Sequence, residues 1–190
     1  MAELYLGLVH YPIYNKRGNI IASAVTNFDI HDIARSCRTY DVQRYYIIHP
    51  LQAQKRIIDK ILHYWQVGYG HVYNPDRYDA LQRVQHMTDI AAAVADIEQR
   101  TGKRPYIVTT DAKIYPNTVT YKFMREQLAE GDRPILLLFG TGYGIEAETQ
   151  SSFDYILEPV YGACDYNHLC VRSAVSIILD RLAGEAWWEK

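Results

Sequence analysis

The sequence predicts an α/β fold in which a mostly parallel sheet is flanked by helices. Short apolar runs of strand length alternate along the chain with longer segments whose apolar residues recur every three or four positions. The run from Ile135 to Phe139 contains only apolar residues, which is typical of a strand buried on both faces of a parallel sheet. Because strands and helices alternate throughout, most neighbouring strands are expected to be parallel.

The chain begins with a predicted strand and a turn. Leu4–Val9 is apolar and predicts the strand, and Ile20–Val25 is apolar again. Residues 10–19 between them are polar, aromatic and rich in turn-forming types. One interpretation of this segment is a solvated hairpin tip. The other is a loop that stacks on nucleic-acid bases and neutralises phosphates through Tyr14, Lys16 and Arg17.

A helix is predicted to start near Thr26. Thr26 with Asp29, or Asp29 with Asp32, has the spacing of a capping box, and acidic residues favour the positive end of a helix dipole. The buried stripe of this helix is predicted to contain Ile30, Ile33 and Cys37. A second stripe offers a titratable imidazole and two guanidinium groups, from His31, Arg35 and Arg38. The alternative for this second stripe is a solvated cationic face.

The middle of the chain predicts a second strand and two more helices. Arg44–His49 predicts the strand. Leu51–Trp65 predicts an amphipathic helix whose inward residues are Ile57, Ile58, Ile61, Leu62 and Trp65. Residues 69–83 show no clear pattern apart from a short strand near Leu81–Val84. A helix capped by Thr88 or Asp89 is expected to end near Arg100.

The last third predicts three strands and two helices. Pro105–Thr109, Ile135–Phe139 and Phe153–Leu157 have strand character. A helix capped by Asn117 or Thr118 is expected to reach Ala129. A long helix capped by Asp165 or Asn167 is predicted to reach about residue 184, with apolar positions at Leu169, Val171, Val175, Ile178, Leu179 and Leu182.

Composition indicates an ordinary soluble globular chain, expected to form one domain over residues 1–190. It is 48% hydrophobic and 22% charged, with a formal net charge of -2 that argues against general coating of a polyanion. A local basic face remains compatible with this charge. No signal peptide, membrane span or low-complexity tract is recognised. Three cysteines suit a reducing compartment, so we expect a cytoplasmic location.

Cys164, His168 and Cys170 form a C-x3-H-x-C cluster. This spacing lacks the paired C-x2-C arrangement and an obvious fourth ligand of a zinc site. We therefore interpret both cysteines as ordinary thiols and expect no metal.

The strand at Ile135–Phe139 is followed by Gly140-Thr-Gly142-Tyr-Gly144, a loop whose main chain a ligand could approach. A P-loop is excluded because Ile145-Glu146 follows instead of Lys and Ser or Thr. A dinucleotide fingerprint is disfavoured, since it needs glycine at position 145 and a following crossover helix. A structural turn without a ligand remains the alternative. Beyond the carboxyl end of the preceding strand, Thr109, Thr110 and Asp111 are candidates for the wall of the same site.

Three stretches together resemble the SPOUT superfamily, the RNA methyltransferases whose chain is tied in a trefoil knot. They are VTNFDIHDIARSCRTYDV, LLLFGTGYGI and YNHLCVRSAVSIILDRL, which match the first, second and third family motifs. The chain looks most similar to a group of predicted bacterial RNA methyltransferases that often stand as a lone SPOUT domain. The resemblance implies a knot over about residues 134–184.

The resemblance also implies that S-adenosylmethionine binds in a bent shape, largely against main-chain atoms. The implied cofactor-binding residues are Thr109, Thr110, Phe139, Gly140, Thr141, Gly142, Gly144, Ile156, Leu157, Pro159, Tyr161, Asn167, Leu169 and Val171. Residues 134–171 contain no Lys or Arg but several acids. This charge suits a ligand with cationic sulfonium and amino groups better than phosphate-bearing NAD.

On the acceptor side the candidate catalytic residues are Asp29, His31, Arg35, Arg172 and Ser173. Arg35 resembles the first-motif arginine that some relatives place beside the acceptor and its phosphate. His31 has a pKa suited to a base, and Asp29 is another possible proton acceptor. Arg172 stands where ribose-methylating relatives carry a small residue, so a ribose 2′-oxygen and a base nitrogen both stay open. The alternative for Arg172 and Ser173 is a surface pair at a dimer seam.

We therefore expect an S-adenosylmethionine-dependent methyltransferase of tRNA or rRNA. Arg38 joins Tyr14, Lys16 and Arg17 among the expected RNA contacts. A homodimer through the C-terminal helix is expected, with Trp187 and Trp188 as large apolar groups beyond it. A non-catalytic RNA- or nucleotide-binding protein of the same fold is the first alternative. A dinucleotide-dependent oxidoreductase is the second.

Overall fold

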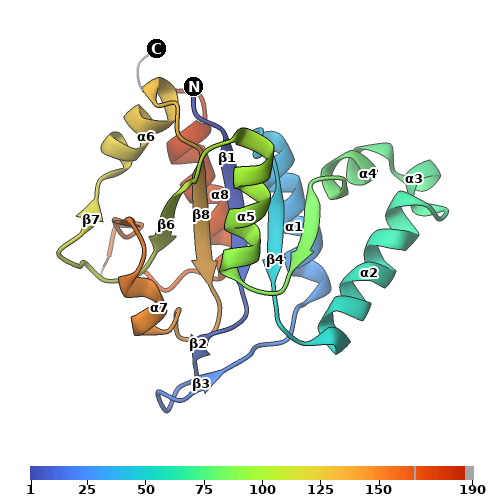
Figure 1. Ribbon diagram of the computed structural model, residues 1–190, viewed down its shortest axis with the longest axis horizontal. Coiled ribbons are helices and arrows are strands. Elements are labelled where there is room, and N and C mark those ends of the chain that lie inside the picture. The colour runs from blue at the N-terminus through green and yellow to red at the C-terminus, as the bar shows by residue number, and fades with distance from the viewer. Residues whose placement is uncertain (165, 187–190) are drawn as a thin grey trace.

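The computed structural model describes residues 1–164 and 166–186, and in this part of the chain seven strands form one parallel sheet (Figure 1). The strand order across the sheet is β5-β4-β1-β8-β6-β9-β7. The strands are β1 (Leu4–Val9), β4 (Tyr45–Ile48), β5 (Val84–Met87), β6 (Tyr106–Thr110), β7 (Thr118–Val119), β8 (Ile135–Gly140) and β9 (Tyr155–Leu157). All six strand pairs are parallel, which confirms the predicted sheet. A separate antiparallel hairpin joins β2 (Ile13–Tyr14) to β3 (Ile20–Ile21).

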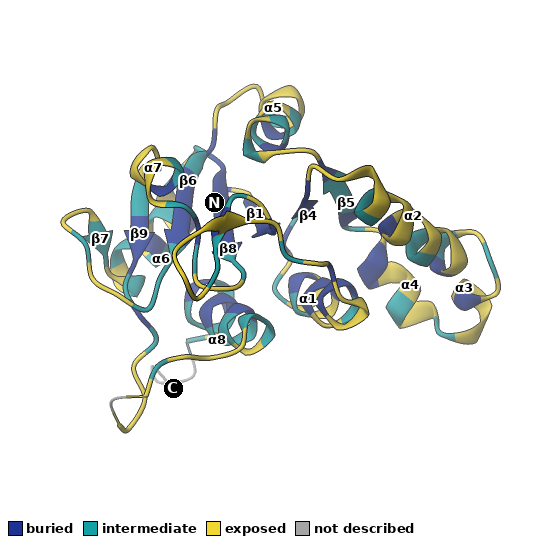
Figure 2. Ribbon diagram, turned by 90° about the horizontal axis from the view of Figure 1, so that it is seen from below, coloured by how far each residue is buried: buried dark blue, intermediate teal, exposed yellow. Residues whose placement is uncertain are grey.

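Helices cover both faces of this sheet (Figure 1). They are α1 (Asn27–Thr39), α2 (Gln52–Gln66), α3 (Gly70–Tyr73), α4 (Pro75–Leu81), α5 (Ile90–Thr101), α6 (Tyr121–Glu130), α7 (Ala147–Ser151) and α8 (Val171–Ala183). Because side chains alternate along a strand, Leu4, Leu6 and Leu8 pack with α1 and α8, whereas Tyr5 and Val9 pack toward α5. Figure 2 shows the resulting buried centre between the helical layers.

The chain adds strands to opposite sides of the sheet after β1 and after β8, so the strand order switches between these two strands. From β1 the chain continues through α1 to β4 on one side, and from β8 it continues through α7 to β9 on the other side. Val9 and Gly140 stand side by side at the carboxyl ends of these two strands. In open α/β sheets such a switch point leaves a crevice beyond the strand ends, where ligands bind.

Several element boundaries differ from the sequence-based expectations. Residues 69–83 form two short helices, α3 and α4, and the following strand is Val84–Met87, later than predicted. Thr118 pairs with β9 as part of the edge strand β7, so Thr120 caps α6 instead of Asn117 or Thr118. Residues 147–151 form the short α7, and Ile57 is 45% exposed because it lies at the outer edge of its helix stripe.

The last helix also starts later than predicted. α8 begins at Val171, and Cys170 precedes it without a side-chain cap. Asn167 does not cap the helix because it lies four residues before the first helical residue, and its side-chain amide donates a hydrogen bond to the carbonyl of Ala112 at 2.9 Å. The proposed capping residue Asp165 and the expected dimer residues Trp187 and Trp188 lie outside the described part of the chain.

The predicted capping box at the start of α1 is confirmed. The hydroxyl of Thr26 accepts a hydrogen bond from the main-chain N–H of Asp29 at 3.2 Å. In return, the Asp29 carboxylate accepts from the main-chain N–H of Thr26 at 3.2 Å and from its hydroxyl at 2.5 Å. These bonds hold the Asp29 side chain, which is only 6% exposed, at a fixed place beside the switch point.

Two buried histidines follow the central strands. His10 comes directly after β1 and His49 directly after β4, and each is 1% exposed. Burial, which disfavours the charged imidazolium, lowers the pKa of both rings, and that of His10 falls from 6.5 to about 4. The nearby charge of Asp29 acts in the opposite direction on His10, and His49 acts in the same direction as burial.

These histidines predict a pH dependence of stability. Between about pH 6.5 and pH 4 the unfolded chain binds a proton at position 10 that the folded chain does not, so folding loses stability as the pH falls. Through His10, the free energy of unfolding falls by about 3 kcal/mol by the time the pH reaches about 4. Denaturant unfolding of the wild type and of His10→Asn at several pH values measures it. The free energy of unfolding should fall less steeply in the variant, and equal slopes would contradict the burial argument.

Candidate functional site

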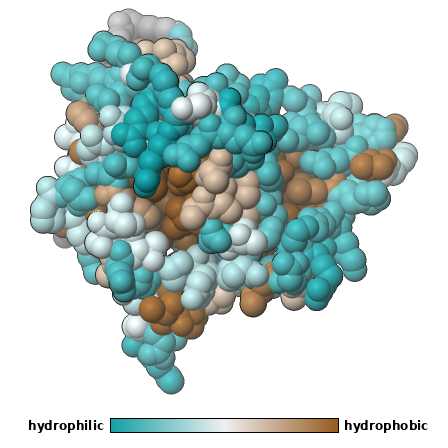
Figure 3. Space-filling view, viewed as in Figure 1, coloured by the Kyte–Doolittle hydropathy of each residue, from teal (hydrophilic) through white to brown (hydrophobic). Residues whose placement is uncertain are grey.

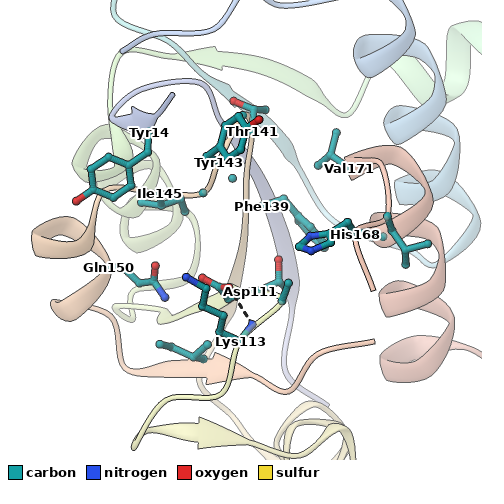
Figure 4. A pocket seen from close by; sticks show the side chains of 18 of the residues that line it. Tyr14, Asp111, Lys113, Phe139, Thr141, Tyr143, Ile145, Gln150, His168 and Val171 are labelled. Carbon is teal, nitrogen blue, oxygen red and sulfur yellow. Dashed lines mark hydrogen bonds between the residues drawn. The ribbon is translucent and has the colours of Figure 1, made fainter. Parts of the chain in front are cut away.

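A cavity of about 1390 Å³ lies beyond the carboxyl ends of β1, β6, β8 and β9. Its walls come from the loop after β8, the segment after β6, the β2–β3 hairpin and the segment before α8. Figure 4 shows Tyr14 and Gln150 on one side of this space and His168 and Val171 on the other, with Phe139 between them. The cavity therefore sits at the topological switch point described above.

The loop after β8 adopts a conformation that favours glycine. Gly142 and Gly144 have φ angles of 60° and 98°, in the left-handed region. A Cβ atom on Gly142 would lie 2.9 Å from the carbonyl oxygen of Tyr14, whereas a Cβ on Gly144 would meet nothing within 4 Å. The space beside the Cα atom of Gly144, which lines the cavity, is therefore open, although its N–H and carbonyl already bond Thr141 and Tyr14.

The β2–β3 hairpin holds this loop in place. The main-chain N–H of Tyr14 donates to the carbonyl of Gly144 at 2.9 Å, and the N–H of Tyr143 donates to the carbonyl of Tyr14 at 3.0 Å. The hydroxyl of Tyr14 accepts a hydrogen bond from the N–H of Ala147 at 3.1 Å. Tyr14 thus lines the cavity and also positions the loop, while Lys16 and Arg17 are exposed at the hairpin tip and do not line it.

The segment after β6 forms a second wall. Thr110 and Asp111 line the cavity, whereas Thr109 is buried and donates its hydroxyl to the carbonyl of Leu138 at 3.3 Å. The Asp111 carboxylate accepts from the N–H of Lys113 at 3.0 Å (Figure 4). It also accepts from the hydroxyl of Tyr115 at 3.0 Å. These bonds fix the carboxylate beside the glycine loop.

The third wall comes from β9 and the segment before α8. Of the residues expected here, Ile156, Asn167, Leu169 and Val171 line the cavity together with the glycine loop and Phe139. Leu157, Pro159 and Tyr161 do not line it. Leu157 and Pro159 are buried, and Tyr161 is 56% exposed. The bond from Asn167 to Ala112 ties this wall to the segment after β6.

The charge of the lining is mostly negative. Asp29, Asp111 and Glu158 line the cavity, against Lys113 as the basic side chain among the described lining residues. Sequence reasoning missed Lys113, since its charge argument covered only residues 134–171 and its candidates after the preceding strand ended at Asp111. It also missed Gln150, which is 7% exposed and whose amide nitrogen has no hydrogen-bond partner within the described chain. Neither residue belongs to a recognisable motif.

Part of the lining belongs to the amino-terminal segments. His10, Ser23, Ala24 and Asp29 line this part. Sequence reasoning named only Asp29, because a single histidine in a turn-rich segment carries no local signal. The position of His10 directly after a central strand is the signal that could have identified it.

The candidate catalytic residues separate into two groups. Asp29 and Arg172 meet where α1 and α8 pack together, with 3.6 Å between Arg172 NH1 and Asp29 Oδ1. Arg172 also pairs with Asp32 at 3.3 Å and lies over the ring of Phe28, 5.3 Å from its centroid. The hydroxyl of Ser173 lies 3.2 Å from the thiol of Cys170, and this hydrogen bond lowers the pKa of that thiol. Arg172 and Ser173 do not line the cavity.

The second group, His31 and Arg35, lies elsewhere on α1, together with Arg38, which was expected to contact RNA. The ring of His31 packs edge-on against Trp65, 5.4 Å between centroids, and burial lowers the pKa of His31. Arg38 forms an ion pair with Asp79 of α4. Arg35 is exposed, and its side chain makes no hydrogen bond or ion pair within residues 1–164 and 166–186. None of these three residues lines the cavity.

Among the described residues, no group of three or more His, Cys, Asp or Glu side chains is arranged to hold a metal ion. Within the same residues, no helix combines the length and the apolar character needed to cross a membrane.

Comparisons with known proteins indicate the family to which this chain is related. A family model described as SAM-dependent RNA methyltransferase matches residues 3–184. A protein of Aquifex aeolicus, described as uncharacterized, is 46% identical over 180 residues, which cover 95% of this chain and 88% of that protein. A tRNA (guanine-N(1)-)-methyltransferase of Nitratidesulfovibrio vulgaris is 46% identical over 185 residues. The match covers 97% of this chain but only 43% of that relative.

Solved structures share the fold. A TrmH/SpoU tRNA modifying enzyme of A. aeolicus superimposes with a TM-score of 0.56 at 16% identity, covering 96% of this chain and 75% of that one. This confirms the resemblance to the SPOUT fold that the three sequence stretches predicted. With the family match over residues 3–184, the chain belongs to the SAM-dependent RNA methyltransferases.

Proposed function

We propose that this chain transfers a methyl group from S-adenosylmethionine to a nucleotide of tRNA or rRNA. The observation that carries the proposal is the cavity at the switch point, which joins an open glycine loop to acidic side chains in a chain of this family. The acceptor atom in this proposal is a ribose 2′-oxygen or a base nitrogen. The relative that is named for guanine N1 does not narrow this choice, because the chain spans only 43% of its length.

The charge of the cavity supports a cationic methyl donor. Asp29, Asp111 and Glu158 outnumber Lys113 in the described lining. Opposite charges attract, so this lining favours the sulfonium and amino groups of S-adenosylmethionine and disfavours the pyrophosphate of NAD. When bound, this donor supplies an electrophilic methyl group. The main chain of Gly140–Gly144 binds and orients this donor. Side chains of the cavity lining hold it from the other sides and exclude water, and they belong to Thr110, Phe139, Ile156, Asn167, Leu169 and Val171.

The size of the cavity supports a second ligand beside the donor. Small-molecule pockets typically measure about 300–1000 Å³, and this cavity measures about 1390 Å³. The donor is proposed to occupy the part lined by the glycine loop and the segment before α8. The acceptor nucleotide then occupies the part lined by His10, Ser23 and Asp29, where methyl carbon and acceptor atom are held close together.

We propose that exposed cations of the β2–β3 hairpin and of α1 hold the RNA. Lys16 and Arg17 are exposed on the hairpin, and Arg35 is exposed on α1 without a hydrogen-bond or ion-pair partner among the described residues. Figure 3 shows apolar side chains over the same hairpin, where Ile20 is 52% exposed. Basic and apolar groups side by side are suited to phosphates and to unstacked bases.

We further propose that residues 1–190 form a single domain with a trefoil knot over about residues 134–184. The similarity to the TrmH/SpoU fold supports this proposal. A crystal structure decides the question. Residues 158–170 passing through the neighbouring loop would support the knot, and residues passing outside that loop would contradict it. We place the protein in the cytoplasm, beside its RNA substrates, which cell fractionation tests.

The proposed activity predicts binding of S-adenosylmethionine and methylation of RNA. Calorimetry should detect heat with this donor and none with NAD. The labelled methyl group should appear in total RNA taken from cells that lack the gene. Binding of NAD without any response to the methyl donor would instead favour an oxidoreductase. Donor binding without label in RNA would favour a non-catalytic RNA- or nucleotide-binding protein.

A matched pair of glycine variants locates the donor within the cavity. Gly144→Ala and Gly102→Ala both place a side chain at positive φ, and neither new Cβ meets a protein atom within 4 Å. Both should therefore lose on the order of 1 kcal/mol of stability from backbone strain. Only Gly144→Ala should also weaken donor binding, by about tenfold or more. Equal donor affinity in the two variants would contradict the assigned cradle.

The proposed RNA contacts predict a difference between two arginines of α1. Arg35→Ala should weaken RNA binding and slow methyl transfer while donor affinity holds, and Lys16→Ala with Arg17→Ala should also weaken RNA binding. Arg38→Ala serves as the control, since Asp79 already neutralises that side chain. Each lost phosphate contact should lower the slope of log affinity against log salt by about 1. Equal effects of Arg35→Ala and Arg38→Ala would contradict this assignment.

We also infer a homodimer through α8 and the adjoining end of α1. Exposed apolar residues around this region support it, including Phe28 at 65% and Tyr166 at 70%. Light scattering should give twice the mass of the chain at micromolar concentration. Phe28→Asp should shift the protein to monomers, whereas Tyr73→Asp, on the comparably exposed α3, should not. A monomeric wild type would overturn the inference.

A further inference from the structure

His10 is a buried histidine of the cavity with one ring nitrogen unused. It is 1% exposed and lines the cavity. Its Nδ1 lies 2.8 Å from the hydroxyl of Ser23, whereas its Nε2 has no hydrogen-bond partner within the described chain. A buried polar atom without a partner carries a free-energy cost, and such a cost is typical of sites prepared for a ligand. His49, by contrast, uses both of its ring nitrogens in hydrogen bonds to main-chain groups.

A chain of hydroxyl groups determines which nitrogen of His10 carries the proton. The hydroxyl of Thr141 donates to the carbonyl of Val9 at 3.0 Å, so its single hydrogen is used. The hydroxyl of Ser23, 2.6 Å from that of Thr141, must then donate to Thr141. Ser23 has no hydrogen left for His10, so Nδ1 of His10 donates to Ser23 and Nε2 keeps a free lone pair.

On this geometry, and resting on the methyltransferase activity proposed above, we propose that Nε2 of His10 is the base that takes the proton from the acceptor atom of the RNA. The new bond joins the methyl carbon to the acceptor oxygen or nitrogen. The bond between that carbon and sulfur breaks, and its electron pair stays on sulfur. The proton that the acceptor loses moves to Nε2, so the step balances without any further reagent.

This assignment narrows the class of substrate. A base is needed only where the acceptor atom carries a hydrogen, as a ribose 2′-hydroxyl or a base N–H does. A ring nitrogen with a free lone pair has no proton to give. The structure therefore favours an acceptor of the first kind, bound in the part of the cavity lined by His10, Ser23 and Asp29.

Burial keeps His10 neutral at working pH and also makes its ring a weaker base than an exposed imidazole. Burial lowers its pKa to about 4, so the ring is neutral near pH 7 and Nε2 can accept a proton. The charged and titratable groups that act on it are Asp29 of α1, which raises its pKa, and His49 after β4, which lowers it. Proton uptake places a positive charge near the Asp29 carboxylate, which stabilises that charge.

Asp29 is less suited to be the base itself. Its Oδ2 already accepts hydrogen bonds from the N–H and the hydroxyl of Thr26. Its Oδ1 faces the guanidinium of Arg172 at 3.6 Å. Both oxygens of this carboxylate are therefore already engaged by partners within the protein, whereas Nε2 of His10 is not.

Nuclear magnetic resonance tests the proton assignment without any ligand. Nitrogen-15 correlation spectra of the imidazole rings in the free protein near pH 7 distinguish a ring protonated on Nδ1 from one protonated on Nε2. Comparison with His10→Asn assigns the signals. We expect His10 to be neutral with its proton on Nδ1. A ring that is protonated on Nε2, or on both nitrogens, would overturn the proposal.

Methyl transfer tests the role. His10→Asn keeps a side-chain N–H that can donate to Ser23 but removes the basic nitrogen. We expect transfer of labelled methyl groups to total RNA from cells lacking the gene to fall by about 100-fold or more, with unchanged affinity for S-adenosylmethionine by calorimetry. His86→Asn is the control. His86 lies within β5, its ring bonds the carbonyl of His49 and it does not line the cavity, so turnover should hold.

The remaining outcomes separate this inference from the proposed function. Full turnover by a folded His10→Asn variant, with an active wild type, would overturn the role of His10 and leave the methyltransferase intact. Loss of donor affinity in the variant would move His10 into the donor site and also overturn it. An inactive wild type on every RNA tested would refute the function itself, and the position of the ring proton would then decide the assignment of the free lone pair.

Discussion

The parallel pairing of β1 with β8 is the constraint on which the rest of this molecule depends. It brings residues more than a hundred positions apart to one edge, with Val9 opposite Gly140. Because the chain leaves these strands in opposite directions, their carboxyl ends stay uncovered and a cavity forms beyond them. His10 and Thr141, which follow the two strands directly, then fall within reach of Ser23 and share one hydrogen-bonded chain.

The central elements could be predicted from the sequence because their residue patterns are decided by burial. β1 and β8 are buried on both faces and appear as unbroken apolar runs, and the Thr26–Asp29 spacing carries its own local hydrogen bonds. Edge elements could not be predicted in this way. β7 exists because Thr118 finds a partner in β9, and Asn167, which was expected to cap α8, instead bonds Ala112 four residues before that helix begins. Such partners are invisible to a local pattern.

The same distinction holds for the cavity. The glycine loop was recognisable because its positive φ angles require that residue type. His10, Lys113 and Gln150 contribute through tertiary proximity alone, so no spacing or motif announced them. The stripe of His31 and Arg38 looked like a site because one helix face carried both, yet that face packs toward α2 and α4. Periodicity identifies a face, whereas the neighbouring elements decide what the face meets.

The hydrogen bonds between the β2–β3 hairpin and the glycine loop have a thermodynamic consequence. Two main-chain bonds join Tyr14 to Tyr143 and Gly144, so neither segment can shift without the other. A ligand that orders one of these segments also reduces the conformational freedom of the other segment. Binding of a second ligand there then costs less conformational entropy. Linkage requires this coupling to be reciprocal. Each of two ligands held on opposite sides of these bonds thereby helps the other to bind by the same factor.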